Sequence, residues 1–315
     1  MANNRVFYAS HGVALASESG DGSAANPSFN PVKTVQGAQS VTMNTNFNLE
    51  QVFQLGRLEL FDNVVTDPSV EVTISKVLDG TQTIYELAVG TGSIVNNANK
   101  RTKFIIGVGS DTSETLSNTS GNSIICDPIY LSSVNYTLTV DGNFTEECNF
   151  VGNDKQIGGA TVAAPSGTSK STVLRRQNLS NSSSLPTEVN GQNIQSITIS
   201  ADFGREQMFK LGRLNTFHRY VTFPLEVSCE IEVLATGLDT LGVDIPDAAC
   251  SGLSLAENTG KFIMCDTDGV DRYEIDLGSK LKLTSVAFGG GDTGGGNATL
   301  TYSYVTYNDL SVRTL

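Results

Sequence analysis

Histidine is the side chain best suited to proton transfer near neutral pH, and the 315-residue sequence contains two, His11 and His218. They fall at positions that do not correspond in the internal repeat described below. Neither stands beside a G-x-S-x-G or cysteine motif that would supply a nucleophile. We therefore interpret both as surface residues and expect the protein not to be an enzyme.

Two polar stretches match ligand-binding loops only in part. Residues 289–296, GGGDTGGG, lack the G-K-[ST] ending and following helix of a phosphate loop. Residues 266–271, DTDGVD, lack the ligand spacing and closing glutamate of a calcium loop. The sequence predicts a hairpin tip and a solvated turn at these places, with no cofactor and no bound metal.

The cysteines are odd in number and form no C-x-x-C motif. A disulfide framework or a zinc site would need paired or regularly spaced cysteines. We expect reduced and mostly buried thiols, which fits assembly in a cytosol-like compartment. The residues concerned are Cys126, Cys148, Cys229, Cys250 and Cys265.

Composition and charge exclude several classes of protein. Charged residues make up 17% of the chain, and the net charge is −13. Both halves are acidic, so no basic domain is present to bind nucleic-acid phosphates. No apolar run is long enough for a membrane span, and the start Met1–Arg5 lacks the apolar segment of a secretory signal.

An internal repeat is the strongest signal in the sequence. Gln39–Pro68 aligns without gaps to Gln195–Pro224 at an offset of 156, with 15 of 30 positions identical. Such self-similarity indicates a duplicated structural unit. We divide the chain into a first β domain over 1–162, a polar linker or arm over 163–188, and a second β domain over 189–315.

The linker is rich in Ser, Thr, Asn and Pro, as is Ser17–Asn30. This composition is typical of exposed, flexible segments, so we expect arms that become ordered only against neighbouring molecules. Deleting 165–185 is then expected to impair polymerisation and leave each domain folded.

Apolar residues alternate through much of each repeat, as in Leu225–Val233 and Val134–Val140. Period two indicates half-buried strands. Residues 41–55 predict one long strand or two in line, with a short helix over 48–54 as the alternative. A further helix is possible over Ala248–Asn258. The fold class is mainly β: two tandem sandwich- or barrel-like domains, each with about one short helix.

The repeat places two arginines at equivalent points, Arg57 and Arg213, seven residues after Glu50 and Glu206. The simpler interpretation is a salt bridge within each domain beside a turn glycine. The functional interpretation pairs each arginine with an acidic residue of a neighbouring copy, since guanidinium suits interfacial ion pairs. The repeated aromatic residues are expected in the core: Phe53, Phe61, Phe209 and Phe217.

The segment from Leu211–Gly212–Arg213 through Phe217–Leu234 resembles tailed-bacteriophage tail tube proteins, as do the N-terminal NNRVFYASHGVAL and the NFNLEQVFQLG and SVEVTISKVLDG segments. The resemblance covers about a third of the chain. It implies sandwich domains whose sheets join into a barrel around a lumen, in rings of six that stack and conduct DNA. With two domains per chain, three chains would close a pseudo-sixfold ring.

The resemblance also sets the expected partners and location. The partners would be further copies of the chain, other tail proteins and DNA as a repelled cargo, within a virion assembled in host cytoplasm and without a membrane. Alternatives are a capsid decoration, collar or tail-terminator protein, and a tandem carbohydrate-binding or adhesin module. The acidic alternation Glu226, Glu230 and Glu232 is a candidate lumen face or outer surface.

Overall fold

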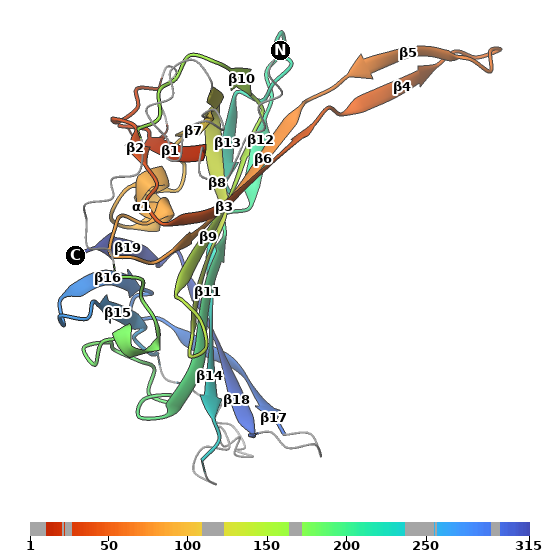
Figure 1. The fold of residues 1–315 in the computed structure, drawn as a ribbon. Coiled ribbons are helices and arrows are strands. Elements are labelled where there is room, and N and C mark those ends of the chain that lie inside the picture. Colours follow the sequence, from red (N-terminus) through yellow and green to blue (C-terminus); the bar gives the residue numbers. More distant parts are fainter. Residues whose placement is uncertain are drawn as a thin grey trace.

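The structure is a computed structural model that describes residues 11–20, 22, 27–108, 123–163, 172–236, 255, 257–290 and 297–315. Cys250, nearly all of the predicted helix over 248–258 and most of the glycine run over 289–296 lie outside these residues. The protein is mainly β, with large antiparallel sheets, as the alternating pattern predicts (Figure 1).

The described elements follow one another in two series, before and after the segment 172–188. The first series is β1 (His11–Ser17), β2 (Lys33–Thr34), β3 (Ala38–Asn46), β4 (Leu49–Phe53), β5 (Leu60–Val65), β6 (Ser69–Val77), α1 (Ile84–Val89), α2 (Ile94–Asn97), β7 (Thr102–Val108), β8 (Ser123–Thr139), β9 (Thr145–Gly152) and β10 (Gln156–Ile157). The second series is β11 (Asn193–Asp202), β12 (Arg205–Met208), β13 (His218–Val221), β14 (Glu226–Leu234), β15 (Lys261–Cys265), β16 (Asp271–Asp276), β17 (Lys282–Gly289), β18 (Thr299–Tyr307) and β19 (Ser311–Thr314).

Eight strands form one antiparallel run in the order β3-β6-β9-β8-β11-β14-β18-β17. The first four come from the first series and the last four from the second. The strands occur in the same spatial order in both series, and β8 joins them by pairing with β11. One sheet therefore runs through both halves of the chain.

Alternation of side chains explains why these segments are strands with one buried face. In β14 the apolar residues Val227, Cys229, Ile231 and Val233 are buried, while the residues between them face outward. Successive side chains of a strand point to opposite faces, so one face of the sheet packs on a core. The predicted strand over 225–233 is confirmed as β14 within one residue at each end. The predicted strand over 134–140 is the last part of β8, which begins at Ser123 and ends at Thr139, and residues 41–55 form two strands in line rather than a helix.

A bulge recurs at matching places in the two halves. The register of β8 against β9 shifts between Leu131 and Ser133, and that of β17 against β18 shifts between Leu283 and Ser285. Matching the bulges equates Leu131 with Leu283 and makes Tyr136 correspond to Phe288. A bulge re-aims the strand that carries it, so β8 and β17 have the same local irregularity.

Shorter elements flank the run of eight strands. Strand β7 pairs with the first part of β8, β1 with β7 and β2 with β1, so these strands continue the sheet, whereas β15, β16 and β19 form a separate three-stranded sheet. Figure 1 shows α1, β1, β2 and β7 beside the first half of the sheet, and β15, β16 and β19 on the same side of the second half. Helix α1 is capped at its N-terminus by Thr83, whose hydroxyl accepts from the Glu86 amide, and is followed by Gly90 with a φ of 88°. One helix per half was expected; both described α-helices lie in the first half, and none is long and apolar enough to cross a membrane.

The segment 172–188 is not the exposed arm that its composition indicates. Leu174 is buried, its amide donates to Leu78 O, and its carbonyl accepts from the Phe144 amide. Further along, Ser184 bridges to Lys261. Backbone hydrogen bonds to neighbouring strands hold this polar segment in place, and polar composition alone cannot reveal such bonds. The described part of Ser17–Asn30 is paired as well, through Glu18 and Phe29.

Candidate assembly interface

The run of eight strands ends in β3 on one side and β17 on the other, while β10 and the series β7, β1 and β2 branch from β8 in the same sheet. Inside the chain, the strand that corresponds to β17 is β8, and the strand that corresponds to β3 is β11. These two pair with each other, with Tyr136 opposite Ile199. The chain therefore contains one complete junction and the two unpaired halves of a second.

Side chains at the open edges are exposed where their counterparts are buried. Tyr136 is completely buried in the internal junction, whereas Phe288, its counterpart on β17, is 58% exposed. Ile199 is buried, and its counterpart Met43 on β3 is only partly buried. A large apolar side chain at an unpaired strand edge is a site for pairing with another chain.

Two hairpins, β4–β5 and β12–β13, leave the sheet between β3 and β6 and between β11 and β14. The β12–β13 hairpin lies against the first half of the chain, while the β4–β5 hairpin projects away from the body (Figure 1). The two hairpins come from the repeated sequence, so the same segment occurs once docked and once free.

Contacts along the docked hairpin explain its position. His218 Nδ1 and Tyr130 Oη are 2.7 Å apart in a hydrogen bond. Arg219 Nη2 donates to Asn153 Oδ1 at 3.0 Å, and the Val221 amide donates to Asn99 Oδ1 at 2.8 Å. The partners Tyr130, Asn153 and Asn99 all belong to the first half of the chain.

The docked and the free hairpin differ most clearly at the root of each hairpin, the residue that directly follows β3 or β11. Phe47 and Phe203 are identical repeat positions, yet Phe47 is 69% exposed and Phe203 is fully buried. The Phe203 amide donates to Ser132 O at 2.9 Å, and the guanidinium of Arg205 lies 5.4 Å from the Phe203 ring centre. The first half of the chain therefore covers a residue whose counterpart has no such cover.

The four candidate interface residues lie on the hairpins, all exposed. Glu50 is in β4 and Glu206 in β12, while Arg57 and Arg213 lie in the hairpin turns. Within the described part of the chain neither arginine forms an ion pair, so the expected salt bridge within each domain is wrong. Each glutamate lies within the paired strands, with Glu50 opposite Val64 and Glu206 opposite Tyr220, whereas each arginine lies past the strand end in the turn.

The repeated aromatic residues are also not in the core. Phe53, Phe61, Phe209 and Phe217 are all exposed on the hairpins. An alternating apolar pattern predicts that a strand has one apolar face, but a two-stranded ribbon has no second layer to cover that face. Their exposure shows that these aromatic side chains remain uncovered in both hairpins, including the docked one.

Of the two histidines, His11 is exposed as predicted, but His218 is buried. Burial, together with the nearby cations of Arg101 and Arg205, lowers the pKa of His218 to about 4, and Glu18 opposes this shift. His218 therefore stays neutral near pH 7 and acts as a packing and hydrogen-bonding residue of the docked hairpin.

The second face of the long sheet carries short polar side chains. Thr73 Oγ1 donates to Asn149 Oδ1 at 2.6 Å, and Asn149 Nδ2 donates to Ser133 Oγ at 2.9 Å. Ser200 and Ser228 continue this pattern in the second half. The charged residues that alternate with the buried positions of the inner strands are acidic: Glu71, Glu147, Glu226, Glu230 and Glu232.

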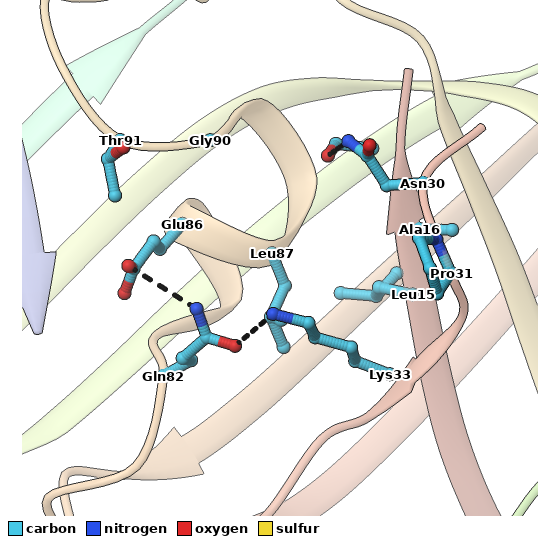
Figure 2. A pocket seen from close by; sticks show the side chains of 11 residues that line it. Leu15, Ala16, Asn30, Pro31, Lys33, Gln82, Glu86, Leu87, Gly90 and Thr91 are labelled. Carbon is cyan, nitrogen blue, oxygen red and sulfur yellow. Dashed lines mark hydrogen bonds between the residues drawn. The ribbon is translucent and has the colours of Figure 1, made fainter. Parts of the chain in front are cut away.

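A cavity of about 300 Å³ lies between β1 and α1 (Figure 2). The amide of Gln82 bridges its two charged groups: Lys33 Nζ donates to Gln82 Oε1 at 2.8 Å, and Gln82 Nε2 donates to Glu86 Oε1 at 3.4 Å. Thr314 Oγ1 donates to the other carboxylate oxygen of Glu86. Contacts within the fold occupy these groups, so we place the candidate site on the edges and hairpins.

The remaining predicted features have plain structural roles. The turn over 266–271 joins β15 to β16, and Asp266 accepts from the amides of Asp268 and Val270. Cys126, Cys148 and Cys229 are buried free thiols, while Cys265 is partly buried. Over the described ranges, histidine, cysteine and acidic side chains form no group that could hold a metal ion.

Sequence reasoning located the repeated segment but not the hairpins that it forms. It also missed the residues that distinguish the open edges, Phe288 and Met43, and the docking residues Tyr130 and Asn153. The identity of Phe47 and Phe203 in the repeat was the sequence feature that could have pointed to the roots of the two hairpins. No protein-family model matches the chain, and no curated protein matches it in sequence. The function must therefore be inferred from the geometry of the edges and hairpins.

Proposed function

We propose that the protein is a structural subunit of a bacteriophage tail tube, located in the virion and without enzymatic activity. Each half of the chain is proposed to be one copy of a duplicated sandwich-like domain. Adjacent domains join edge to edge into a closed barrel, and rings of this barrel stack into a tube that conducts DNA. The partners are further copies of the chain and other tail proteins.

The internal β8·β11 junction is the observation that carries the proposal. It joins the last strand of one four-strand unit to the first strand of the next. The open strands β17 and β3 have the same places in their units, so β17 of one molecule can pair with β3 of another by the same register. Repeating a head-to-tail junction gives a ring when the rotation closes, and closure removes exposed edges.

The register of the intermolecular junction follows from the internal one. Asn135 lies opposite Ser200 in the chain. The matching bulges equate Asn135 with Ala287, and the repeat offset equates Ser200 with Asn44. We therefore expect Ala287 to lie opposite Asn44 of the neighbouring molecule.

Three chains per ring are proposed because two units per chain then give six units around the ring. The polar and acidic second face of the sheet is proposed to line the lumen, with the short elements outside. Carboxylates and small hydroxyls without a compensating basic patch repel phosphates, so DNA would pass without adhering. No basic residue among the inner-strand positions of that face offers counterion release.

Cysteine cross-linking tests this junction directly. Directly opposed residues of antiparallel strands lie about 4.5–5.5 Å apart between Cα atoms, within disulfide range. Under mild oxidation, a chain carrying Ala287→Cys and Asn44→Cys is expected to give covalent dimers and trimers on a non-reducing gel. The ladder should end at three chains, because a closed trimer leaves no engineered thiol free.

Three controls make the outcome specific. Asn135→Cys with Ser200→Cys should form an intramolecular bond, the unsubstituted chain gives the background, and Ala287→Cys with Thr42→Cys is two residues out of register. If the in-register pair Ala287→Cys and Asn44→Cys gave no cross-links while the intramolecular control pair did, the edge junction would be refuted. A ladder extending to six chains would refute the trimeric ring.

A further inference from the structure

The two hairpins pair in the same register, so their residues can be matched one by one. In β4–β5 the residue opposite Val52 is Asp62, and in β12–β13 the residue opposite Met208 is His218. Both positions are separated by the repeat offset of 156. Asp62 of the free hairpin therefore has the place that His218 has in the docked one.

The surface that receives the docked hairpin has a counterpart in the second half of the chain. His218 docks on Tyr130, which directly precedes Leu131 at the bulge of β8. Lys282 directly precedes Leu283 at the matching bulge of β17. The second half therefore carries an ammonium group at the position where the first half carries a phenol.

The residue types change together on the two surfaces. Within the chain, His218 and Tyr130 are buried, and the neutral imidazole and the phenol share a hydrogen bond of 2.7 Å. Their counterparts Asp62 and Lys282 are exposed and have opposite charges. A junction that repeats the internal one brings this carboxylate and this ammonium together, on two different molecules.

Lys282 is available for such a contact. Its Nζ lies 3.5 Å from Glu257 Oε1 and 3.4 Å from Leu255 O, both long distances for a charged donor. The side chains of Lys282 and Glu257 are 47% and 54% exposed, and an ion pair with that exposure contributes little to stability. An incoming carboxylate can therefore approach this ammonium without displacing a buried contact.

We propose that Asp62 of one chain forms an ion pair with Lys282 of its neighbour, and that this pair seats the free β4–β5 hairpin on the second half of that neighbour. This inference rests on the proposed function and adds a specificity-determining pair to its lateral junction. The occupant is a second copy of this chain because the internal junction already has the docked arrangement and because the two charges are complementary.

The pair makes the junction between chains chemically different from the internal one. Two arginines of the docked hairpin, Arg205 and Arg219, donate to acceptors in the first half. The repeat offset matches them with Leu49 and Asn63, which carry no charge. Asp62 is thus the charged residue that remains among these three positions. Because salt screens exposed ion pairs, the junction between chains should be salt-sensitive, whereas the internal junction should not.

Charge reversal tests the pair. We compare Asp62→Lys, Lys282→Glu and the double reversal, each in the chain carrying Ala287→Cys and Asn44→Cys. Like charges opposite each other disfavour an interface strongly, so each single reversal should slow cross-linking between chains about tenfold or more. The double reversal should restore the rate to within about threefold of the parent chain, because the two residues again attract each other. Initial rates are read from non-reducing gels.

Two controls exclude other causes. Glu50→Lys makes the same change of charge on the same hairpin, but its counterpart Glu206 stays exposed in the docked hairpin, so the rate should not change. Raising the salt concentration should slow cross-linking of the parent chain and accelerate that of the single reversals, because screening weakens attraction and repulsion alike. Intramolecular cross-linking of Asn135→Cys with Ser200→Cys should not respond. Urea unfolding should be unchanged in all charge variants, because the substituted side chains are exposed.

The possible outcomes are distinct. Cross-linking of the parent chain that neither single reversal affects would refute the ion pair and leave the ring intact. Slower cross-linking in both single reversals without recovery in the double reversal would also refute it, since the two residues would then act in separate contacts. Failure of the parent chain to cross-link would instead refute the proposed ring.

Discussion

At the scale of single residues, His218 links the docked hairpin to the first half of the chain. Its Nδ1 bonds Tyr130, its ring lies edge-on to Tyr220 with ring centres 4.2 Å apart, and its Nε2 is buried without a hydrogen-bond partner. Arg101 and Arg205 disfavour a further positive charge here, while Glu18 partly offsets them. Protonation of this imidazole therefore weakens the docked state.

We expect the free energy of unfolding to decrease at acidic pH because His218 becomes protonated more readily in the unfolded chain. The pKa of His218 is about 4 in the folded protein and about 6.5 when unfolded. Between these values the unfolded chain binds more protons, so the free energy of unfolding decreases as pH falls from about 6.5 to about 4. From pH 7.5 to pH 5 the loss amounts to at most about 2 kcal/mol.

Urea unfolding of the parent protein and of His218→Gln at the two pH values measures this contribution. The difference in unfolding free energy between the proteins should change with pH by that amount, while the carboxylates titrate equally in both. An identical pH dependence in the variant would contradict the assigned role of His218.

At the scale of elements, the two hairpins show how a neighbour decides burial. The same phenylalanine is a core residue at the root of β12–β13 and a surface residue at the root of β4–β5. We expect Phe203→Ala to lower the unfolding free energy by about 3–4 kcal/mol, as for other buried aromatic truncations. Phe47→Ala should change the stability of the monomer by less than about 0.5 kcal/mol.

Phe47→Ala also carries an expectation for assembly. Phe47→Ala should reduce cross-linking of the Ala287→Cys and Asn44→Cys chain, because the missing contact belongs to the lateral junction. Monomer stability is read from urea unfolding and assembly from the non-reducing gel. Equal destabilisation by both substitutions would contradict the view that only Phe203 is covered within the chain.

The elements also show how far the sequence could be read. Alternation predicted β14 and the last part of β8 because each has one face on a core, and the repeat predicted two copies of one unit but not the hairpins in them. The pattern could not show that Phe53 and Phe61 are exposed, because period two looks the same with or without a covering layer. Ser- and Asn-rich composition suggested an arm over 163–188, but the backbone bonds of Leu174 with Leu78 and Phe144 tie its described part to the fold.

This packing changes the expectation for the linker deletion. Residues 172–185 pair with strands of both halves, through Leu174 and Ser184. Removing them leaves backbone groups of those neighbours unpaired, which costs free energy wherever they are buried. The deletion is therefore a poor probe of polymerisation, and the edge and hairpin substitutions replace it.

At the scale of the whole molecule, the chain contains two four-strand units, one complete junction between them and the two open halves of a second junction. The sheet passes through both units, ends in two complementary edges, and has one polar and acidic face. A chain of this kind left alone exposes Phe288 at one edge and Met43, partly buried, at the other. In the proposed ring, β17 of one chain pairs with β3 of its neighbour, and this pairing covers both edges.

Electron microscopy of the purified protein over a range of concentrations tests the central claim most directly. We expect rings or stacked tubes with a central hole, in which averaged end-on views show six similar lobes formed by three chains. Native mass measurement of single rings should agree with three times the chain mass of 33.4 kDa. Monomers at every concentration, together with no cross-linking through Ala287→Cys and Asn44→Cys, would contradict the proposal.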